Sequence, residues 1–194
     1  MVVYYPKGTG SNASSKEGIC YSNRGMGLED ILNRTNSYYN EVAKCAVIHK
    51  KPTPIQIVKV EYPKRSAATI REAYFKQSSY SDYTGIFKGK HIDFEAKETR
   101  NKTSIPLSNF HQNQIDHMRQ VLKHQGICFA LVRFVTTDEC FLLDAAYILL
   151  FWDDQKYGGR KSIPKPFFEE KGFAIPYSNQ PELDYLKVVN EHYF

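Results

Sequence analysis

The chain has 194 residues, of which 42% are hydrophobic and 14% aromatic, and this is enough to bury the core of one domain. Lysine and arginine outnumber aspartate and glutamate by 26 to 21, and the resulting net charge of +5 favours a polyanionic partner. The longest apolar run, residues 145–152, is far shorter than the ~20 residues that a helix needs to cross a bilayer, so no membrane-spanning helix is expected.

Residues 1–18 are polar and rich in glycine and serine. They contain no apolar segment of the kind found in a secretory signal, and we expect a disordered tail before a single domain over residues 19–194. The four cysteines are scattered, without Cys-x-x-Cys or a paired histidine spacing, which is typical of reduced thiols in an intracellular protein. A cytoplasmic location is therefore expected.

The predicted elements alternate between helices and strands. The spacing of Leu28, Ile31 and Leu32 predicts a first helix over residues 27–43. Further helices are predicted over residues 111–125, capped by Ser108 or Asn109, and over 145–153 and 181–192. Strands are predicted over residues 46–49, 55–60, 127–135 and 140–144, with a hairpin over 83–97. Residues 61–79 interrupt this order and are interpreted as an excursion from the sheet. The order predicts an α/β fold in which helices flank a central mixed sheet.

The second half of the predicted hairpin carries charged side chains on one face. Because the side chains of a strand alternate with a period of two, Glu95 and Lys97 share a face, while Ile92 and the other apolar residues line the opposite face. The hairpin would also return Asp82 to the neighbourhood of Glu95. Two carboxylates offer hard oxygen ligands for Mg²⁺, and an ammonium beside them can offset charge on a reacting phosphate. The pattern therefore favours metal-assisted phosphodiester cleavage.

The same pattern has a simpler interpretation. A glutamate two residues before a lysine is common by chance, and Glu95 and Lys97 can equally form a solvated salt bridge on an exposed sheet face. A second copy of the pattern, Glu169 to Lys171, follows two prolines and lacks the alternating apolar residues of a strand. We therefore exclude the second copy as a candidate site.

A basic segment precedes the hairpin. Residues 50–76 hold seven basic and two acidic side chains, and this difference of five equals the net charge of the whole chain. The basic residues are Lys50, Lys51, Lys59, Lys64, Arg65, Arg71 and Lys76. Tyr62, Tyr74 and Phe75 lie among them, and Arg100 and Lys102 add positive charge after the hairpin. Phosphate contacts combined with aromatic stacking predict a nucleic acid as the substrate, with a solvated lysine-rich face as the alternative.

At the level of whole motifs, the chain resembles a known family. The runs Tyr-Ser-Asn-Arg-Gly-Met at 21–26, Ala-Val-Ile-His-Lys-Lys-Pro-Thr-Pro at 46–54, Tyr-Pro-Lys-Arg-Ser at 62–66, Asp-Phe-Glu-Ala-Lys-Glu-Thr at 93–99 and Gly-Ile-Cys-Phe at 126–129 are similar to those of the RecU Holliday junction resolvases of low-GC Gram-positive bacteria. The resemblance extends over about residues 21–152. These ordered runs are far more specific than a glutamate and a lysine two residues apart.

The resemblance implies a restriction-endonuclease-like PD-(D/E)xK core, assembled as a homodimer. It implies that residues 61–79 form a protruding stalk that enters a four-way DNA junction, with Arg65 acting in junction recognition or cleavage. It further implies that members of the family modulate the RecA recombinase, and a nucleoid-associated protein is expected.

The resemblance also assigns roles at the candidate metal site. Asp82, Glu95 and Gln114 are implied as ligands of Mg²⁺, with Mn²⁺ as a substitute, and Lys97 as the residue that stabilises the transition state or orients the attacking water. Family members carry a threonine two positions before the aspartate, where this chain has Tyr80, which leaves that ligand open. Two other functions remain as alternatives: a sequence-specific endonuclease on the same fold, and a non-enzymatic protein that binds DNA and modulates the recombinase.

Overall fold

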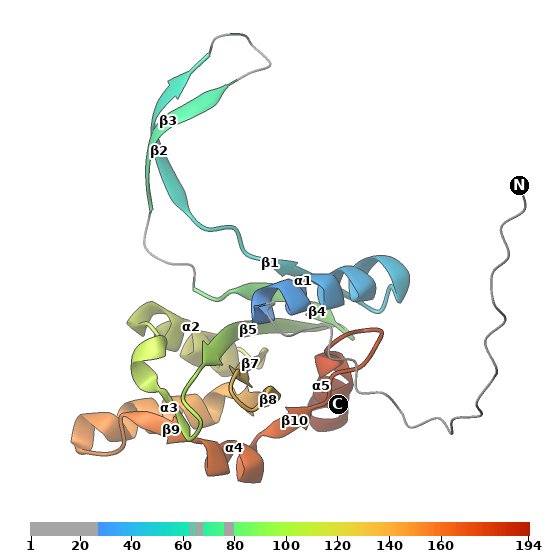
Figure 1. Cartoon of the computed structure of the whole chain (residues 1–194), viewed down its shortest axis with the longest axis vertical. Helices are drawn as coiled ribbons and strands as arrows, with labels where there is room; N and C mark the ends of the chain where they lie inside the picture. The colour runs from blue at the N-terminus through green and yellow to red at the C-terminus, as the bar shows by residue number, and fades with distance from the viewer. Residues whose placement is uncertain (1–26, 63, 65–67, 76–79) are drawn as a thin grey trace, which may run out of the picture.

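The computed structural model describes residues 27–62, 64, 68–75 and 80–194 (Figure 1). The predicted tail, together with Arg65 and Lys76, lies outside the described residues. The helices are α1 (Leu28–Ser37), α2 (Gln112–Lys123), α3 (Ala145–Asp154), α4 (Lys165–Lys171) and α5 (Tyr185–Tyr193). The strands are β1 (Ala46–Lys50), β2 (Ile55–Glu61), β3 (Thr69–Phe75), β4 (Tyr83–Phe87), β5 (Lys90–Thr99), β6 (Ser104–Pro106), β7 (Ile127–Phe134), β8 (Glu139–Asp144), β9 (Ser162–Pro164) and β10 (Phe173–Ile175). In these ranges no helix combines the length and the apolar character needed to span a bilayer.

The centre of the fold is a six-stranded mixed sheet with the strand order β1-β4-β5-β7-β8-β10. Strands β5 and β7 are parallel, and the other neighbouring pairs are antiparallel. The predicted hairpin forms between β4 and β5, where Lys88 and Gly89 both have positive φ, 48° and 77°. Two consecutive positive φ values suit a tight hairpin turn whose twist matches that of the strands. The predicted mixed sheet flanked by helices is confirmed.

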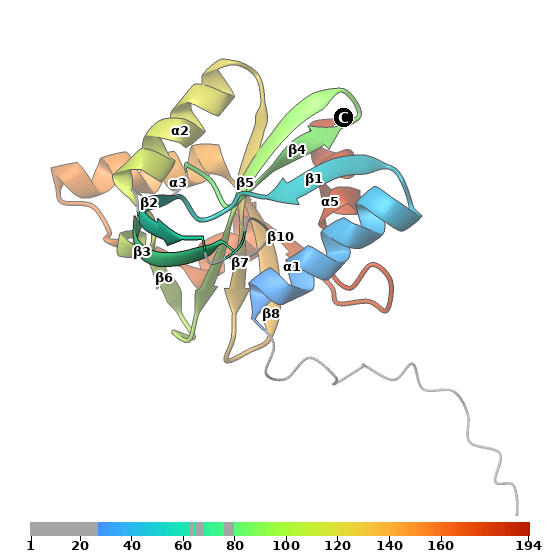
Figure 2. The ribbon, with the colours of Figure 1, turned by 90° about the horizontal axis from the view of Figure 1, so that it is seen from above.

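Helices cover both faces of this sheet. Buried residues of α1 and α5 pack on one face, and those of α2, α3 and α4 pack on the other (Figure 2). Strand β7 is buried along its whole length because it contributes side chains to both cores. Strand β5 differs: its even-numbered residues Ile92 and Phe94 enter the first core, whereas the face turned toward α2 carries charged residues. A cluster of polar side chains therefore lies on one face of the sheet at its middle strands.

An aromatic stack fixes the strands beneath this polar face. Tyr83 of β4, Phe94 of β5 and Phe129 of β7 are neighbours across the strands, and their rings stack at centroid distances of 4.8 and 5.0 Å. All three rings are fully buried, and Tyr185 of α5 covers the ring of Phe94 at 5.1 Å. Because Tyr83 follows Asp82 and Phe94 precedes Glu95, this stack holds the backbone that carries both acids.

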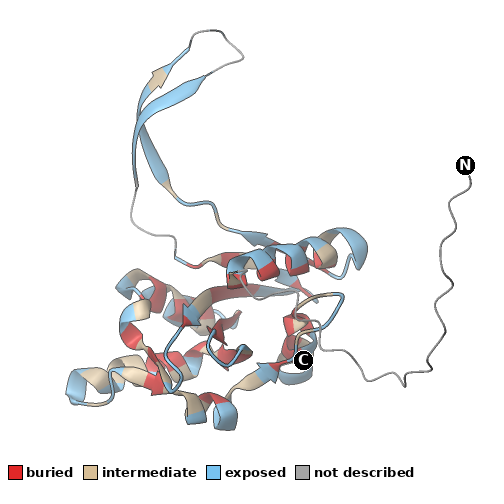
Figure 3. Cartoon of the chain, viewed as in Figure 1, coloured by how far each residue is buried: buried red, intermediate tan, exposed pale blue. Residues whose placement is uncertain are grey.

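Strands β2 and β3 form a separate two-stranded sheet, called the arm below, that extends away from the body (Figures 1 and 3). Its described side chains are exposed or half-exposed, including Ile57 and Val58. The sequence places residues 55–60 before the excursion, but these residues pair with β3 and not with the central sheet. The chain therefore leaves the body before β2, and among the described residues β3 is the only strand that pairs with residues 55–60.

Several boundaries differ from those predicted. Helix α2 takes His111 as its N-cap, with Gln114 closing a capping box, whereas Ser108 and Asn109 form a short 3₁₀ turn. Helix α5 begins at Tyr185, since Leu183 is held in a bridge with Tyr177. The sequence patterns predict no helix or strand where β6, β9, α4 and β10 form. They are short, and their partners are distant in sequence.

Candidate active site

The candidate site lies where β5 passes under the first turns of α2. Asp82 comes directly before β4, and Glu95 and Lys97 lie on the face of β5 that is turned toward α2. The Lys97 ammonium lies 2.9 Å from Glu95 Oε2 and 3.9 Å from Asp82 Oδ2. The backbone N–H of Ala96 donates to Asp82 Oδ2 at 2.9 Å, which ties Asp82 to β5. The hairpin brings the two acids and the lysine together as predicted.

This geometry excludes the solvated salt bridge. Glu95 is only 1% exposed and the Lys97 side chain 14%. Strand β5 is an interior strand, and α2 covers its charged face, so neither side chain points into bulk water. The ammonium also lies 5.6 Å from the centre of the Phe110 ring, a cation–π contact that holds the long side chain in place.

Gln114 links Glu95 to the start of α2. Its Nε2 donates to Glu95 Oε2 at 2.7 Å, and its Oε1 accepts from the backbone N–H of His111 at 3.0 Å. The same Oε1 lies 3.4 Å from the Lys97 ammonium. Because the capping box fixes the direction of the amide, Gln114 orients Glu95 in this structure.

The charge state of Glu95 is strongly perturbed. Burial raises the pKa of Glu95 to about 8; the ammonium of Lys97 opposes this shift, and the nearby carboxylate of Asp82 adds to it. Glu95 Oε1 is buried and has no hydrogen-bond partner within the described residues. An unpartnered carboxylate oxygen beside a second carboxylate is a donor set that suits a hard divalent cation. Within the described ranges, no group of three or more His, Cys, Asp or Glu side chains is arranged so that it could hold a metal ion.

Comparison with known proteins agrees with these motifs. A family model described as Recombination protein U, RecU, matches residues 23–191. The chain is 61% identical over 174 residues to a Geobacillus sp. (strain WCH70) protein, covering 90% of this chain and 86% of that protein. It is 55% identical over 199 residues to a Geobacillus kaustophilus protein, covering 100% and 99%. It is 52% identical over 200 residues to a Bacillus cereus (strain G9842) protein, covering 100% of both. The chain belongs to the RecU family. The three relatives carry the name Holliday junction resolvase RecU.

Tyr80 stands where the resemblance leads us to expect a threonine that contacts the metal, and its ring packs near α2. The Tyr80 side chain is exposed, and its ring lies 5.8 Å from the ring of His117 on α2. This placement gives the phenol a contact with α2 and leaves its expected role as a metal ligand without support.

The predicted DNA-binding residues fall into three groups. Lys64, Arg71 and Tyr74 are exposed on the arm, where Arg71 pairs with Glu61 and the Tyr74 hydroxyl donates to Glu72. Arg100 and Lys102 are exposed in the loop after β5. Lys50, at the end of β1, forms an ion pair with Glu29. Arg65 and Lys76, as well as the side chain of Phe75, lie outside the described residues.

Lys51 behaves differently from the other predicted DNA contacts. Its ammonium lies 3.3 Å from Asp93 Oδ1 and donates to Ser81 Oγ at 2.6 Å. In this structure the Lys51 ammonium therefore contacts groups of the protein itself and is not free to bind a phosphate. The sequence analysis missed Asp93, although it continues the same alternating face as Glu95 and Lys97.

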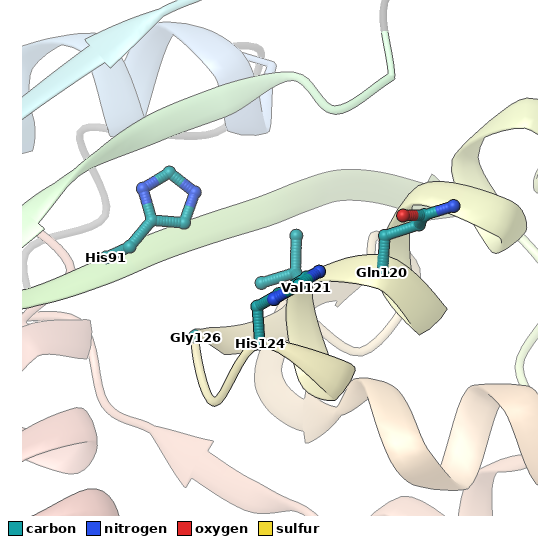
Figure 4. Close-up of a pocket in the computed structure, with 5 residues that line it drawn as sticks. All are labelled: His91, Gln120, Val121, His124 and Gly126. Carbon is teal, nitrogen blue, oxygen red and sulfur yellow. The ribbon is translucent and has the colours of Figure 1, made fainter.

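Figure 4 shows a recess near the candidate site. That recess, of about 300 Å³, lies between the start of β5 and the last turns of α2, and its lining residues are His91, Gln120, Val121, His124 and Gly126. It contains none of the residues that converge at Glu95.

Proposed function

We propose that this RecU protein is a structure-specific endonuclease that resolves Holliday junctions by metal-dependent hydrolysis of phosphodiester bonds. The observation that carries the proposal is the convergence of Asp82, Glu95 and Lys97 on one covered face of β5, at the base of the arm. The printed names of the relatives support the same activity. A mixed sheet that carries an acid, a second acid and a lysine in this order is the arrangement expected of a PD-(D/E)xK nuclease, and we propose that fold for the core.

The side chains of the site would divide the chemistry between them. A bound Mg²⁺, or Mn²⁺ in its place, would supply positive charge at the scissile phosphate and a water of lowered pKa. Asp82 and Glu95 would hold the ion, and Gln114 keeps the Glu95 carboxylate aimed at it. Lys97 would offset the additional negative charge of the phosphate in the transition state, because its ammonium already lies between the two acids.

The arm would direct the enzyme to branched DNA. It is exposed or half-exposed and carries Lys59 and Arg71, with Lys64 between its two strands, whereas Asp93 and Glu95 in the body are buried. Such a narrow basic hairpin is suited to the open centre of a four-way junction, where four phosphate backbones surround it. Two strands of like polarity must be cut to separate the duplexes, and we propose that a two-fold homodimer supplies the two sites.

A synthetic four-way junction tests the proposal directly. The protein should nick it in the presence of Mg²⁺, and chelation of the metal should abolish the reaction. Glu95→Gln should reduce cleavage by at least ~1000-fold while junction binding in a gel shift changes less than about threefold. Glu169→Gln is the matched control, since it removes the acid of the other Glu-x-Lys pair, which lies on α4.

Two results would remove the proposal. Normal cleavage by Glu95→Gln would place the chemistry elsewhere. Cutting of linear plasmid at one defined site, without preference for the junction, would identify a sequence-specific endonuclease instead.

A further inference from the structure

Asp93 lies beside the candidate site, where its carboxylate is buried and surrounded by polar partners. It is 1% exposed, and both of its carboxylate oxygens have partners. Ser81 Oγ donates to Oδ1 at 2.9 Å, and the Lys51 ammonium lies 3.3 Å from the same oxygen. Nε2 of His91 and Nε2 of His117 lie 3.0 and 2.6 Å from Oδ2. An ionised carboxylate only accepts hydrogen bonds, so this set describes a buried anion held by four donors.

The donors on Oδ1 come from the two points at which the chain leaves and re-enters the body. Lys51 follows β1 and precedes the arm, whereas Ser81 follows the arm and precedes β4. The two are also joined to each other, because the Lys51 ammonium donates to Ser81 Oγ at 2.6 Å. The backbone N–H of Lys51 donates to the carbonyl oxygen of Asp82 at 2.8 Å. Lys51 and Ser81, which we call the roots of the arm, therefore both contact one buried carboxylate, that of Asp93.

The donors on Oδ2 come from the body. His91 lies on β5 and faces α2 across the recess in Figure 4, and His117 lies on α2 itself. Burial alone would raise the pKa of Asp93, but the hydrogen bonds from His117 and His91, with the charge of Lys51, hold it well below its usual range.

The position of these contacts connects the arm to the metal ligands. Ser81 is the residue before Asp82, and Asp93 lies two residues before Glu95 on the same face of the same strand. A shift of the arm roots relative to β5 would therefore change the separation of the Asp82 and Glu95 carboxylates. Groups that orient metal ligands in this way typically change metal affinity or activity by ~10 to 100-fold when they are removed.

We propose that Asp93 is a positioning residue that fastens both roots of the arm to the catalytic strand and thereby sets Asp82 against Glu95 for the divalent cation. The proposal rests on the proposed function, because it requires those two acids to hold the ion. Lys51 and Ser81 are the two contacts through which Asp93 acts on the arm.

The direction in which Mg²⁺ affinity changes in two variants separates a positioning role of Asp93 from simple electrostatics. Lys51→Met removes a positive charge near the cation site, and the loss of repulsion alone would strengthen cation binding. Positioning predicts the opposite, because the arm roots lose their connection to Asp93. Ser81→Ala changes no charge, so electrostatics predicts no change, whereas positioning again predicts weaker binding.

The experiment measures Mg²⁺ binding to the full chain without DNA by isothermal titration calorimetry, which gives the half-saturating Mg²⁺ concentration directly. We expect the half-saturating Mg²⁺ concentration to increase by about tenfold in both Lys51→Met and Ser81→Ala, and at least as much in Asp93→Asn. Junction affinity without divalent metal should change less than about threefold in Ser81→Ala, and high Mg²⁺ should restore its cleavage rate. Asp116→Asn is the matched control, since Asp116 is an exposed aspartate on α2.

Each result decides the proposal. The proposal is overturned if the half-saturating Mg²⁺ concentration is unchanged or lower in folded Lys51→Met and Ser81→Ala. A lower melting temperature of these variants without metal does not rescue it, because a network that only stabilises the fold would give the same result. If Asp93→Asn does not fold, the other two variants still decide. Asp82→Asn separates failure of the proposed function from failure of the positioning role. Normal Mg²⁺ binding by Asp82→Asn would contradict the proposed function itself. If Asp82→Asn loses Mg²⁺ binding while Lys51→Met and Ser81→Ala bind Mg²⁺ normally, only the positioning role is contradicted.

Discussion

Two antiparallel hairpins of this chain, β2–β3 and β4–β5, have the same secondary structure and opposite surroundings. Strands β2 and β3 have no sheet partner besides each other among the described residues, so the apolar side chains of Ile57 and Val58 remain 50% and 53% exposed. Strands β4 and β5 lie inside the central sheet between two layers of helices, and Glu95 on β5 is 1% exposed.

The difference shows that the neighbours of a hairpin, and not its pairing, decide what its charges can do. Lysine and arginine on the arm remain hydrated and can attract a polyanion over a long range. Asp93 and Glu95 of β5 are removed from water, so each charged or polar neighbour has a large effect on them. One hairpin is therefore suited to recognition and the other to chemistry.

The largest expected effect that tests this comparison is on stability. Phe94→Ala removes the middle ring of the aromatic stack and should lower the free energy of unfolding by about 3–5 kcal/mol. Ile57→Ala on the arm should change it by less than about 0.5 kcal/mol, because Ile57 is half exposed. Urea denaturation of both variants gives the two values. Equal losses would mean that the arm is packed against something in solution.

The next effect is on catalysis. Lys97→Met keeps the length of the side chain but removes its ammonium, and cleavage of a four-way junction should fall by about 100 to 1000-fold. Single-turnover rates at saturating Mg²⁺ measure this loss. Lys90→Met, an exposed lysine at the start of the same strand, is the control and should cleave normally. A Lys97→Met protein that cuts at the normal rate would show that the covered lysine only stabilises the fold.

A pH effect follows from the buried acid. Burial raises the pKa of Glu95 to about 8 in the folded, metal-free protein, whereas the ordinary pKa of a glutamate in the unfolded chain is 4.5. Between these values the folded state binds more protons than the unfolded state, so stability is full below the lower pKa and is lost as pH rises through the higher one. Between about pH 6 and about pH 8 the free energy of unfolding should fall by about 2 kcal/mol.

Chelator-treated protein is the sample for this measurement. Glu95→Gln cannot titrate at this position and should remove most of the slope. A wild-type stability that rises over the same pH range would contradict the burial of a protonated Glu95.

The smallest expected effect is on the arm. Lys64→Ala removes one exposed positive charge from the arm, and junction affinity should fall a few-fold. The slope of log affinity against log salt should decrease by about one, as expected for the loss of a single phosphate contact. Stability should not change, since no buried group is affected. An unchanged salt slope would place Lys64 away from the DNA.

Much of the fold could be predicted from local patterns in the sequence. The apolar spacing at Leu28, Ile31 and Leu32 indicated α1, and the alternation around Phe94 indicated β5, because each pattern reports one buried face of one element. The candidate acids followed from the same alternation together with the length of one hairpin. By contrast, β6, β9 and β10 are three residues each, too short for a periodic signal, and they form only against distant strands.

The arm and Asp93 show where local patterns fail. The sequence assigned residues 55–60 to a strand correctly, but it could not tell that the strand lacks a place in the central sheet. It showed Asp93 only as one more polar residue of β5, since Lys51, Ser81 and His117 are brought to it from three other parts of the chain.

The sequence by itself determined the strand alternation that puts Glu95 and Lys97 on one face, the hairpin that returns Asp82, and the family. The tertiary structure alone decided that this face lies under α2, that Glu95 is desolvated, and that both roots of the arm meet at Asp93. The physical reason is that alternation depends on neighbouring residues, whereas burial and the pKa of a carboxylate depend on every chain segment packed around it.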